Sequence, residues 1–310
     1  MQIAWFPDAP RPAWPRPVVA LGNFDGLHRG HQKLVDEVRR QAQERAGTSV
    51  VMIFDPHPPR ILRPDKAPPL LMTLDQKIEA FQHAGVDALA IVRFTPELAK
   101  WEPELFVETV LLDWLRVAEV WVGANFLFGR DRSGTFTLLR ALGEDRGFHV
   151  EPIEPVRYKD FVVSSTRIRR LIEEGRVDEA GSLLGHHYFV DGTVIGGDGR
   201  GRDLGFPTAN LLTRNELMPA DGIYATMAIL AQTYHQAVSS IGIRPTIGDD
   251  RPTIETFILE GRHEVYGAPM RLAFVKWLRP QMKFDDLAGL QAQITRDAAA
   301  AADLFAQMTV

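Results

Sequence analysis

The chain has 310 residues, of which 45% are hydrophobic and 24% are charged, and its formal net charge is −5. This composition is ordinary for a globular protein, and the length predicts two domains. The absence of cysteine excludes disulfides, thiolate catalysis and cysteine-ligated zinc. The negative net charge argues against a broad nucleic-acid-binding surface.

The sequence predicts neither a membrane span nor a signal peptide. No apolar run approaches the roughly 18 residues of a span. The first 17 residues are rich in Pro and Trp and lack a charged start followed by an apolar core. We therefore expect a cytoplasmic protein without a membrane or nucleic-acid partner. Trp5, Phe6 and Trp14 favour an N-terminal segment packed on its own domain over an interface between copies, and a homo-oligomer is left open.

A strand-like run at residues 18–21, a glycine-bearing turn and a helical pattern follow one another near the N-terminus. Such a turn suits a phosphate, because free backbone N–H groups and the helix dipole favour negative charge. His28 and His31 lie in this turn, where two imidazoles could donate to phosphate oxygens. The turn lacks the Gly-Lys-Ser/Thr of a P-loop. From the residues alone, the pair is also compatible with a metal site or with surface histidines.

Through about residue 160, strand-like and helix-like patterns alternate, which favours a parallel sheet with helices on both faces. The helix expected at residues 73–84 turns Leu74, Ile78 and Phe81 to one face. Ligands of such sheets bind beyond the carboxyl ends of the strands. Further strands are expected at residues 49–54, 88–94, 119–122 and 149–152, and helices at 73–84, 104–115 and 132–146.

Two polar clusters follow expected strands in this half. The stiff sequence 55–59 (DPHPP) comes after one strand, and the glycine- and aromatic-rich sequence 123–130 after another. Taken alone, each is better interpreted as a loop between core elements. A third cluster, Ser164-Ser165-Thr166, can cap the helix that follows it. Arg167 and Arg169 beside that helix N-terminus would favour triphosphate charge.

The second half changes character. Residues 173–188 are expected as a short helical connector broken by glycines, with the domain boundary near residue 185. The domains are therefore expected at 1–185 and 186–310. Successive strands with short turns predict an antiparallel barrel, and the pattern from residue 284 predicts an amphipathic terminal helix. The expected strands cover residues 189–195, 222–230, 234–243, 253–260 and 270–278.

Several motifs resemble known families. The turn His28-Arg29-Gly30-His31 resembles the HxGH signature of nucleotidyltransferases, and residues 163–169 resemble their second signature, ISSTxxR. The string GRDLGFPTAN at residues 201–210 resembles the PTAN region of riboflavin kinases. Residues 241–259 and 278–284 are similar to that family's IGxRPT…ETxxL and LRPxxKF stretches. Together the motifs resemble the bacterial bifunctional riboflavin kinase/FAD synthetase family, over nearly all the chain after about residue 16.

The resemblance implies an α/β nucleotidyltransferase domain with a Rossmann-like parallel sheet, followed by an antiparallel β-barrel riboflavin kinase domain with a C-terminal helix. It implies a transferase that makes FMN from riboflavin and ATP, and then FAD from FMN and ATP with release of pyrophosphate. Mg²⁺ is the implied metal, and riboflavin, FMN and ATP are the implied small-molecule partners.

The resemblance also implies roles for individual residues. Glu255 is the expected general base of the kinase, and Thr208 and Asn210 are expected to bind Mg²⁺ on ATP. His28, His31 and Arg169 are expected to stabilise the charge of the triphosphate. The other implied ATP-binding residues are Gly22, Phe24, Asp25, Gly30, Ser165, Thr166, Gly201 and Arg202, and the implied flavin-binding residues are Asp55, His57, Pro58, Asn125 and Arg279.

Three positions depart from the family pattern: Asn125, near which an acidic residue is frequent, Ser240 and Glu264. We expect activity to survive the changes at Ser240 and Glu264, because these residues lie beside the catalytic positions and not on them. Three alternatives stay open on sequence. They are a nucleotidyltransferase for pantetheine phosphate or a polyol phosphate with a regulatory second domain, a flavin-storage or sensor protein without catalysis, and a chain with one active site only.

Overall fold

The computed structural model describes residues 1–196, 205–243, 252–261 and 265–308. The chain divides into two compact units, Met1–Ser164 and Ser165–Val310. This division groups helices α6 (Ser165–Glu173) and α7 (Val177–Leu184) with the second unit. The domain limits 1–185 and 186–310 remain a prediction.

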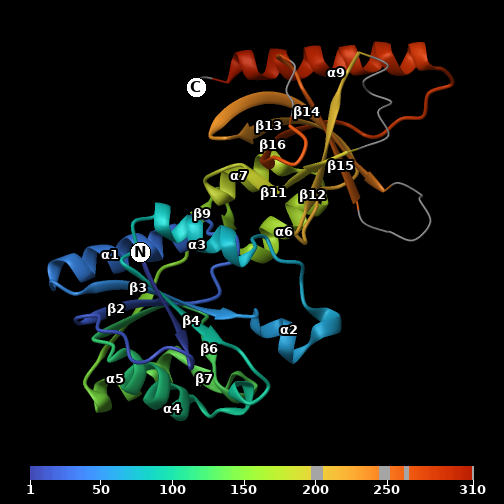
Figure 1. The fold of residues 1–310 in the computed structure, drawn as a ribbon. Helices are drawn as coiled ribbons and strands as arrows, with labels where there is room; N and C mark the ends of the chain where they lie inside the picture. Colours follow the sequence, from blue (N-terminus) through green and yellow to red (C-terminus); the bar gives the residue numbers. More distant parts are fainter. Residues whose placement is uncertain (197–204, 244–251, 262–264, 309–310) are drawn as a thin grey trace. The chain divides into compact units, whose positions relative to one another are not determined.

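The first unit is built on a six-stranded parallel sheet in the order β1-β4-β3-β2-β5-β8 (Figure 1). This confirms the predicted parallel sheet. The edge strand β1 was not predicted, because its neighbourhood is dominated by Pro and Trp; it pairs with β4 along its whole length. The strands are β1 (Gln2–Phe6), β2 (Pro17–Leu21), β3 (Thr48–Asp55), β4 (Ala88–Arg93), β5 (Glu119–Gly123) and β8 (His149–Ile153).

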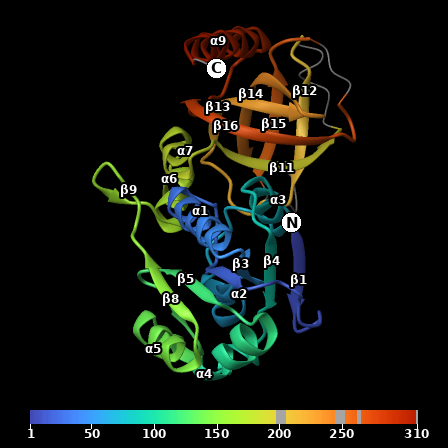
Figure 2. The same ribbon diagram turned by 90° about the vertical axis from the view of Figure 1, so that its left-hand side faces the viewer.

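Helices cover both faces of this sheet. Helix α1 (Arg29–Glu44) lies on one side, and α4 (Pro103–Phe106) and α5 (Phe136–Arg146) lie on the other (Figure 2). Strand β2 is buried on both faces, as expected of a central parallel strand. The N-terminal segment packs on its own unit as predicted, since Trp14 is buried in the core beside the sheet.

Three local predictions need correction. The helix expected at 104–115 is α4 followed by a π-helix, η3 (Val107–Leu115). The helix expected at 132–146 begins at Phe136, because the Thr135 side chain caps it. The stiff turn after β3 leads into a short helix, α2 (Pro58–Leu62).

The buried stripe of helix α3 (Leu74–His83) also differs from the prediction. Phe81 is buried as expected, but the other buried residues are Gln76 and Lys77. Gln76 completes a capping box with Thr73, so its polar atoms are used at the helix start. Lys77 thus places an amino group on the buried side of α3.

The strand order places a topological switch point beside β2. From β2 the chain continues to β3 and β4 on one side of the sheet, and then to β5 and β8 on the other. In open α/β sheets, ligands bind at the carboxyl ends of the two strands that flank this point. The turn with His28 follows β2 and the loop with Asn125 follows β5. The fold therefore brings two of the predicted polar segments to the expected edge.

The second unit contains a closed six-stranded barrel whose strand pairs are all antiparallel, as predicted (Figure 1). The first barrel strand closes the ring by pairing with the last. Strand β12 was not predicted, because its sequence mixes Thr and Asn with apolar residues. The strands are β11 (Tyr188–Ile195), β12 (Thr208–Thr213), β13 (Gly222–Leu230), β14 (Thr233–Ile243), β15 (Pro252–Ile258) and β16 (Pro269–Arg279).

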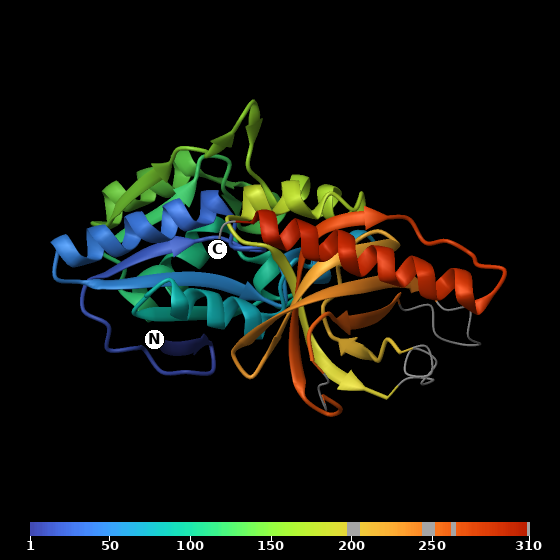
Figure 3. The same ribbon diagram turned by 90° about the horizontal axis from the view of Figure 1, so that it is seen from above.

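The terminal helix α9 (Leu287–Gln307) confirms the predicted amphipathic helix and lies across the barrel (Figure 3). Its Ala301 and Phe305 pack against a buried apolar patch of the strands that includes Ile223 and Val275. Helix α7 continues through Gly181, which was expected to break it. Among the described residues, no helix is both long and apolar enough to cross a membrane.

Candidate active sites

The histidine turn, residues 22–31, joins β2 to α1. His28 is the N-cap of α1, and its Nδ1 accepts a hydrogen bond of 3.3 Å from the backbone N–H of His31. The two imidazole rings stack with centroids 3.6 Å apart and planes 15° apart. A Cβ at Gly30 would lie 3.2 Å from the His28 ring, so glycine allows this close approach. The motif spacing thus produces one compact pair of rings.

Both rings of this pair are neutral at pH 7. Burial lowers the pKa of His28 to about 4, although its own backbone and Asp25 act in the opposite direction. Burial, and then the charges of His28 and Lys77, hold the pKa of His31 well below its usual value. Because Nδ1 of His28 accepts a hydrogen bond, its proton lies on Nε2. The histidine turn therefore offers uncharged N–H donors.

This electrostatic arrangement predicts acid sensitivity. Between pH 6.5 and about 4, unfolded His28 binds a proton and folded His28 does not, so stability falls as the pH decreases through this window. One such proton is worth about 1.4 kcal/mol per pH unit. We expect His28→Asn to lose less stability than the wild type over this window, as measured by urea unfolding of both proteins. Equal losses would contradict the lowered pKa of His28.

The base of the turn is held by Asp25 and Phe24. The buried carboxylate of Asp25 accepts hydrogen bonds from the backbone N–H groups of Leu71 and Met72, at 3.0–3.2 Å. Phe24 has a positive φ of 48° and packs edge-on against Phe81, with ring centroids 5.5 Å apart. Gly22 lies against the Phe24 ring. These contacts make the turn rigid before any ligand is bound.

Lys77 is a candidate that the sequence reasoning missed. It is 5% exposed, and its Nζ donates a hydrogen bond of 3.2 Å to the carbonyl of Asn23, inside the histidine turn. The sequence feature that could have identified Lys77 is its spacing from Phe81, which places it on the apolar side of the helix. A lysine there has to be paired when it is buried.

Asp55 is the last residue of β3 and borders a cavity. Burial raises the pKa of its carboxyl, while the charges of Lys77 and Arg93 act in the opposite direction. His57 is buried and forms the N-cap residue of α2, and Pro58 is the first residue of that helix. The cavity, here called the Asp55 pocket, has a volume of about 490 Å³ and is lined by Trp5, Asp8, Ala9, Asp55, Pro56 and Arg93.

The loop after β5 carries Asn125, whose side chain is exposed. Next to it, the rings of Phe126 and Phe128 stack with centroids 5.5 Å apart, and Phe128 is buried. This aromatic support fixes a loop beside the switch point of the sheet. Of the remaining ATP-site predictions, Ser165, Thr166 and the buried Arg169 lie on α6 in the second unit.

The register of the barrel strands brings the predicted kinase residues together. Asn210 lies opposite Glu255 where β12 pairs with β15, and Thr208 lies two residues from Asn210. Residues that are opposite, or two apart on one strand, share a face of the sheet. Ala209 and Thr256 are buried and face the barrel interior. Thr208, Asn210 and Glu255 therefore share an outer face of the barrel, here called the kinase face.

A row of buried hydroxyl groups supports the kinase face from behind. Thr226 and Ser239 are joined by a hydrogen bond of 2.8 Å, and Ser239 and Thr256 by one of 2.9 Å. All three side chains are fully buried. Because each hydroxyl has a partner, this polar row links three strands without leaving an unsatisfied group.

Comparisons with known proteins match both units. Residues 11–167 match the FAD synthetase family and residues 184–305 match the riboflavin kinase family. The bifunctional riboflavin kinase/FMN adenylyltransferase of Escherichia coli (strain K12) is 35% identical over 289 residues, which cover 93% of this chain and 92% of the relative. The chain belongs to the bifunctional riboflavin kinase/FMN adenylyltransferase family.

Two other comparisons also cover nearly the whole chain. The Listeria monocytogenes serovar 1/2a member of this family is 36% identical over 294 residues, covering 94% of this chain and 93% of the relative. The crystal structure of the macrolide-efflux protein from Streptococcus pneumoniae is similar with a TM-score of 0.88 and 27% identity, covering 97% of this chain and 99% of that one. The family matches confirm the predicted pair of transferase activities and their order along the chain.

In this family member, Arg279 is committed to a structural contact. Its Nε and Nη2 donate to the two carboxylate oxygens of Asp297, at 2.8 and 2.6 Å. Gln293 donates to the same carboxylate. The pair joins the end of β16 to α9. The flavin contact predicted for Arg279 remains a prediction, and Gly201, Arg202 and Glu264 lie outside the described residues.

This ion pair predicts a large stability effect. Asp297→Ala leaves a mostly buried guanidinium without its carboxylate, since the side chains of Arg279 and Asp297 are 16% and 7% exposed. Breaking such a pair costs about 3–5 kcal/mol. We expect a lower thermal midpoint for the second unit, measured by calorimetry. The exposed Asp303 on the same helix supplies the control, Asp303→Ala, and equal midpoints for the two variants would contradict the prediction.

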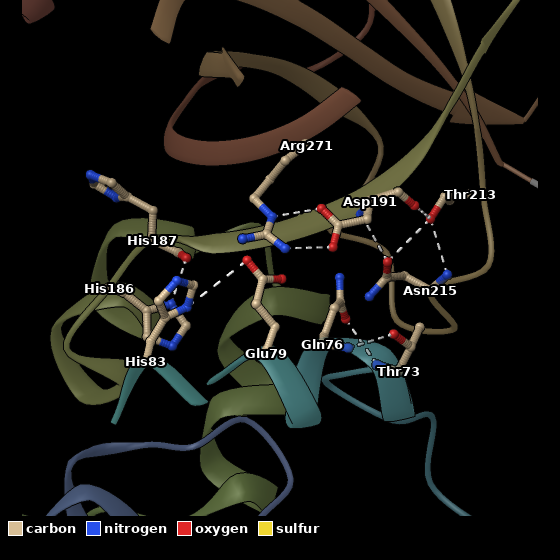
Figure 4. Close-up of polar contacts among 10 residues, drawn as sticks. All are labelled: Thr73, Gln76, Glu79, His83, His186, His187, Asp191, Thr213, Asn215 and Arg271. Carbon is tan, nitrogen blue, oxygen red and sulfur yellow. Dashed lines mark hydrogen bonds and ion pairs between the residues drawn. The ribbon is translucent and has the colours of Figure 1, made fainter. Parts of the chain in front are cut away.

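A polar cluster on the barrel was not predicted (Figure 4). Arg271 donates to both carboxylate oxygens of Asp191 at 2.7 and 2.8 Å, and its guanidinium carbon lies 4.1 Å from the Phe189 ring centroid. Asn215 accepts from the backbone N–H of Asp191, and the Thr213 hydroxyl donates to the Asp191 carbonyl. The contacts join β11, β12 and β16, so the cluster is structural. Its members come from three separate segments of the chain, so no single local motif marks the cluster.

Proposed function

We propose that this chain makes FAD from riboflavin in two ATP-dependent steps, with riboflavin phosphorylation at the kinase face and FMN adenylylation at the histidine turn. The observation that carries the proposal is the strand register that sets Glu255 beside Asn210. The position of the histidine turn at the sheet's switch point supports the second activity.

For the first step, Glu255 accepts the proton of riboflavin's terminal ribityl hydroxyl. That oxygen then forms a bond to the γ-phosphorus of ATP, and the bond from this phosphorus to the β-bridging oxygen breaks to release ADP. The hydroxyl of Thr208 and the amide oxygen of Asn210 are hard oxygen donors on one face, which suits Mg²⁺ held together with ATP phosphates. When bound, Mg²⁺ would neutralise phosphate charge.

For the second step, an oxygen of the FMN phosphate forms a bond to the α-phosphorus of ATP, and pyrophosphate leaves. No general base is needed, because this phosphate is already ionised at pH 7. His28 and His31 donate hydrogen bonds to the triphosphate as neutral imidazoles. Arg169 contributes positive charge, a role that rests on its place in the ISSTxxR-like motif.

The predicted contacts of the two substrates complete the proposal. Phe24 and Asp25 shape the ATP side of the turn. Asp55, His57, Pro58 and Asn125 meet the flavin of FMN, a role supported by the Asp55 pocket at the carboxyl end of β3. We also propose a cytoplasmic enzyme, because both reactions consume ATP, and domain limits at residue 185.

The test is a chromatographic time course of the purified chain with riboflavin, ATP and Mg²⁺. We expect FMN to form first and FAD to follow. A parallel reaction with pantetheine phosphate or a polyol phosphate in place of FMN should give no adenylylated product. FMN without FAD would contradict the second activity, and the absence of any flavin product would favour a flavin-binding protein without catalysis.

A further inference from the structure

Lys77 is the buried cation of the histidine turn. It projects from α3, which packs beside the turn through Phe81 and Phe24. Its ammonium group donates to the carbonyl of Asn23, the residue that precedes Phe24 in the turn. A buried ammonium is costly unless its surroundings are arranged for it. The amino group of Lys77 is therefore held at the turn that carries the two histidines.

Charged and titratable groups surround the histidine turn on several elements. His31 faces His28 from the turn itself and Lys77 from α3. His28 faces Asp25, which is engaged by the backbone of residues 71 and 72. The charges of Lys77 and Arg93 both act to lower the pKa of Asp55. The charge of Lys77 thus lowers the pKa of His31 in the histidine turn and that of Asp55 at the Asp55 pocket.

We propose that Lys77 is a positioning residue for adenylyl transfer: it fixes the histidine turn through Asn23 and adds a positive charge at the turn besides that of Arg169, so that His28 and His31 act as neutral donors. This inference rests on the proposed adenylyltransferase function of the first unit. In this proposal Lys77 contributes charge at the turn, and His28 and His31 contribute hydrogen bonds.

The chemistry of the reaction explains the need for such a cation. The FMN phosphate and the triphosphate of ATP are both anionic, and they must approach to bonding distance. A positive charge held in place before the reaction lowers this repulsion without any reorganisation during the step. The charge also acts more strongly in a buried environment than in water. Neutral histidines could not supply it.

The charge of Lys77 has a second, measurable effect. Because like charges repel, the ammonium disfavours protonation of His31. Removal of the ammonium must raise the pKa of His31. The titration of His31 therefore reports whether Lys77 is charged beside the turn, and the rate of FMN adenylylation reports whether the reaction uses that charge.

The experiment compares Lys77→Met with Lys33→Met in the full chain. Methionine retains most of the apolar stem of lysine and removes the charge. Lys33 is a matched control in the same unit, because its Nζ also donates to a backbone carbonyl, that of Glu154 at 3.1 Å, but at the surface. For Lys77→Met we expect FMN adenylylation to slow by about 100-fold. Riboflavin phosphorylation should be unchanged in both variants, and Lys33→Met should retain FMN adenylylation.

The deciding readout is the titration of His31, followed by NMR of the histidine-labelled protein. The midpoint should move to higher pH in Lys77→Met and stay at the wild-type value in Lys33→Met. Lys77→Arg retains the charge and should keep the low midpoint, which provides a second variant if Lys77→Met folds poorly. An unmoved midpoint in Lys77→Met, or wild-type adenylylation by that variant, would overturn the proposal. A wild-type chain without FAD synthesis would instead refute the proposed function, because the midpoint shift does not depend on turnover.

Discussion

Glu255→Gln is expected to abolish riboflavin phosphorylation while FMN adenylylation continues. Glutamine keeps the size of the side chain opposite Asn210 but cannot accept the proton of the ribityl hydroxyl. The loss of a general base lowers a rate by about 10²–10⁴-fold. The measurement is the rate of FMN formation from riboflavin, with FAD formation from added FMN as the internal reference.

Glu260→Gln supplies the matched control. Glu260 lies just beyond β15 and is exposed, so the same chemical change is made off the kinase face. We expect this variant to phosphorylate riboflavin at the wild-type rate. If Glu255→Gln keeps more than about a tenth of the wild-type rate, Glu255 is not the base. A similar loss in both variants would point to a change of fold at the end of the strand.

His28→Asn is expected to stop FAD formation and to leave FMN formation unchanged. Asparagine is a favourable N-cap residue, so its side chain can still accept the backbone N–H of His31 and keep the start of α1. It cannot reproduce the stacked imidazole with a donor at Nε2. Loss of one donor that stabilises developing charge costs about 10²–10³-fold in rate.

The control for this variant is His83→Asn. His83 lies at the end of α3, and its side chain is 77% exposed. The two substitutions are chemically identical and fall in the same unit. We expect His83→Asn to make FAD at the wild-type rate. Wild-type FAD formation by His28→Asn would remove the histidine turn from the proposed mechanism, whereas Glu255 and the kinase face would be unaffected.

Much of the fold could be predicted because its signals are local. The alternation of strand and helix patterns led to the parallel sheet, and the run of short strands led to the barrel. Predictions failed where tertiary contacts overrode local pattern. Strand β1 forms because β4 offers an edge for pairing, and η3 departs from a regular α-helix in a stretch whose apolar pattern alone suggested one.

The candidate sites show the same division. His28 and His31 are three residues apart, so one turn brings their rings together, and the motif alone was sufficient to predict that they are close. Glu255 and Asn210 meet only because β12 pairs with β15 in one register. The flavin contact of Arg279 stays a prediction from its motif, and only the structure shows that its guanidinium is bound by Asp297 of α9. Motif positions identify residues without identifying their partners.

The sequence by itself determined the two-domain plan, the order of the two activities and the residue types that could carry them, because each depends on neighbours within a few positions. The tertiary structure decided the strand order, the common face of Thr208, Asn210 and Glu255, and the burial of Lys77 beside the histidine turn. These depend on pairing and packing between segments far apart in the chain. Burial in turn sets the charge of His28 and His31, since desolvation is what keeps both rings neutral.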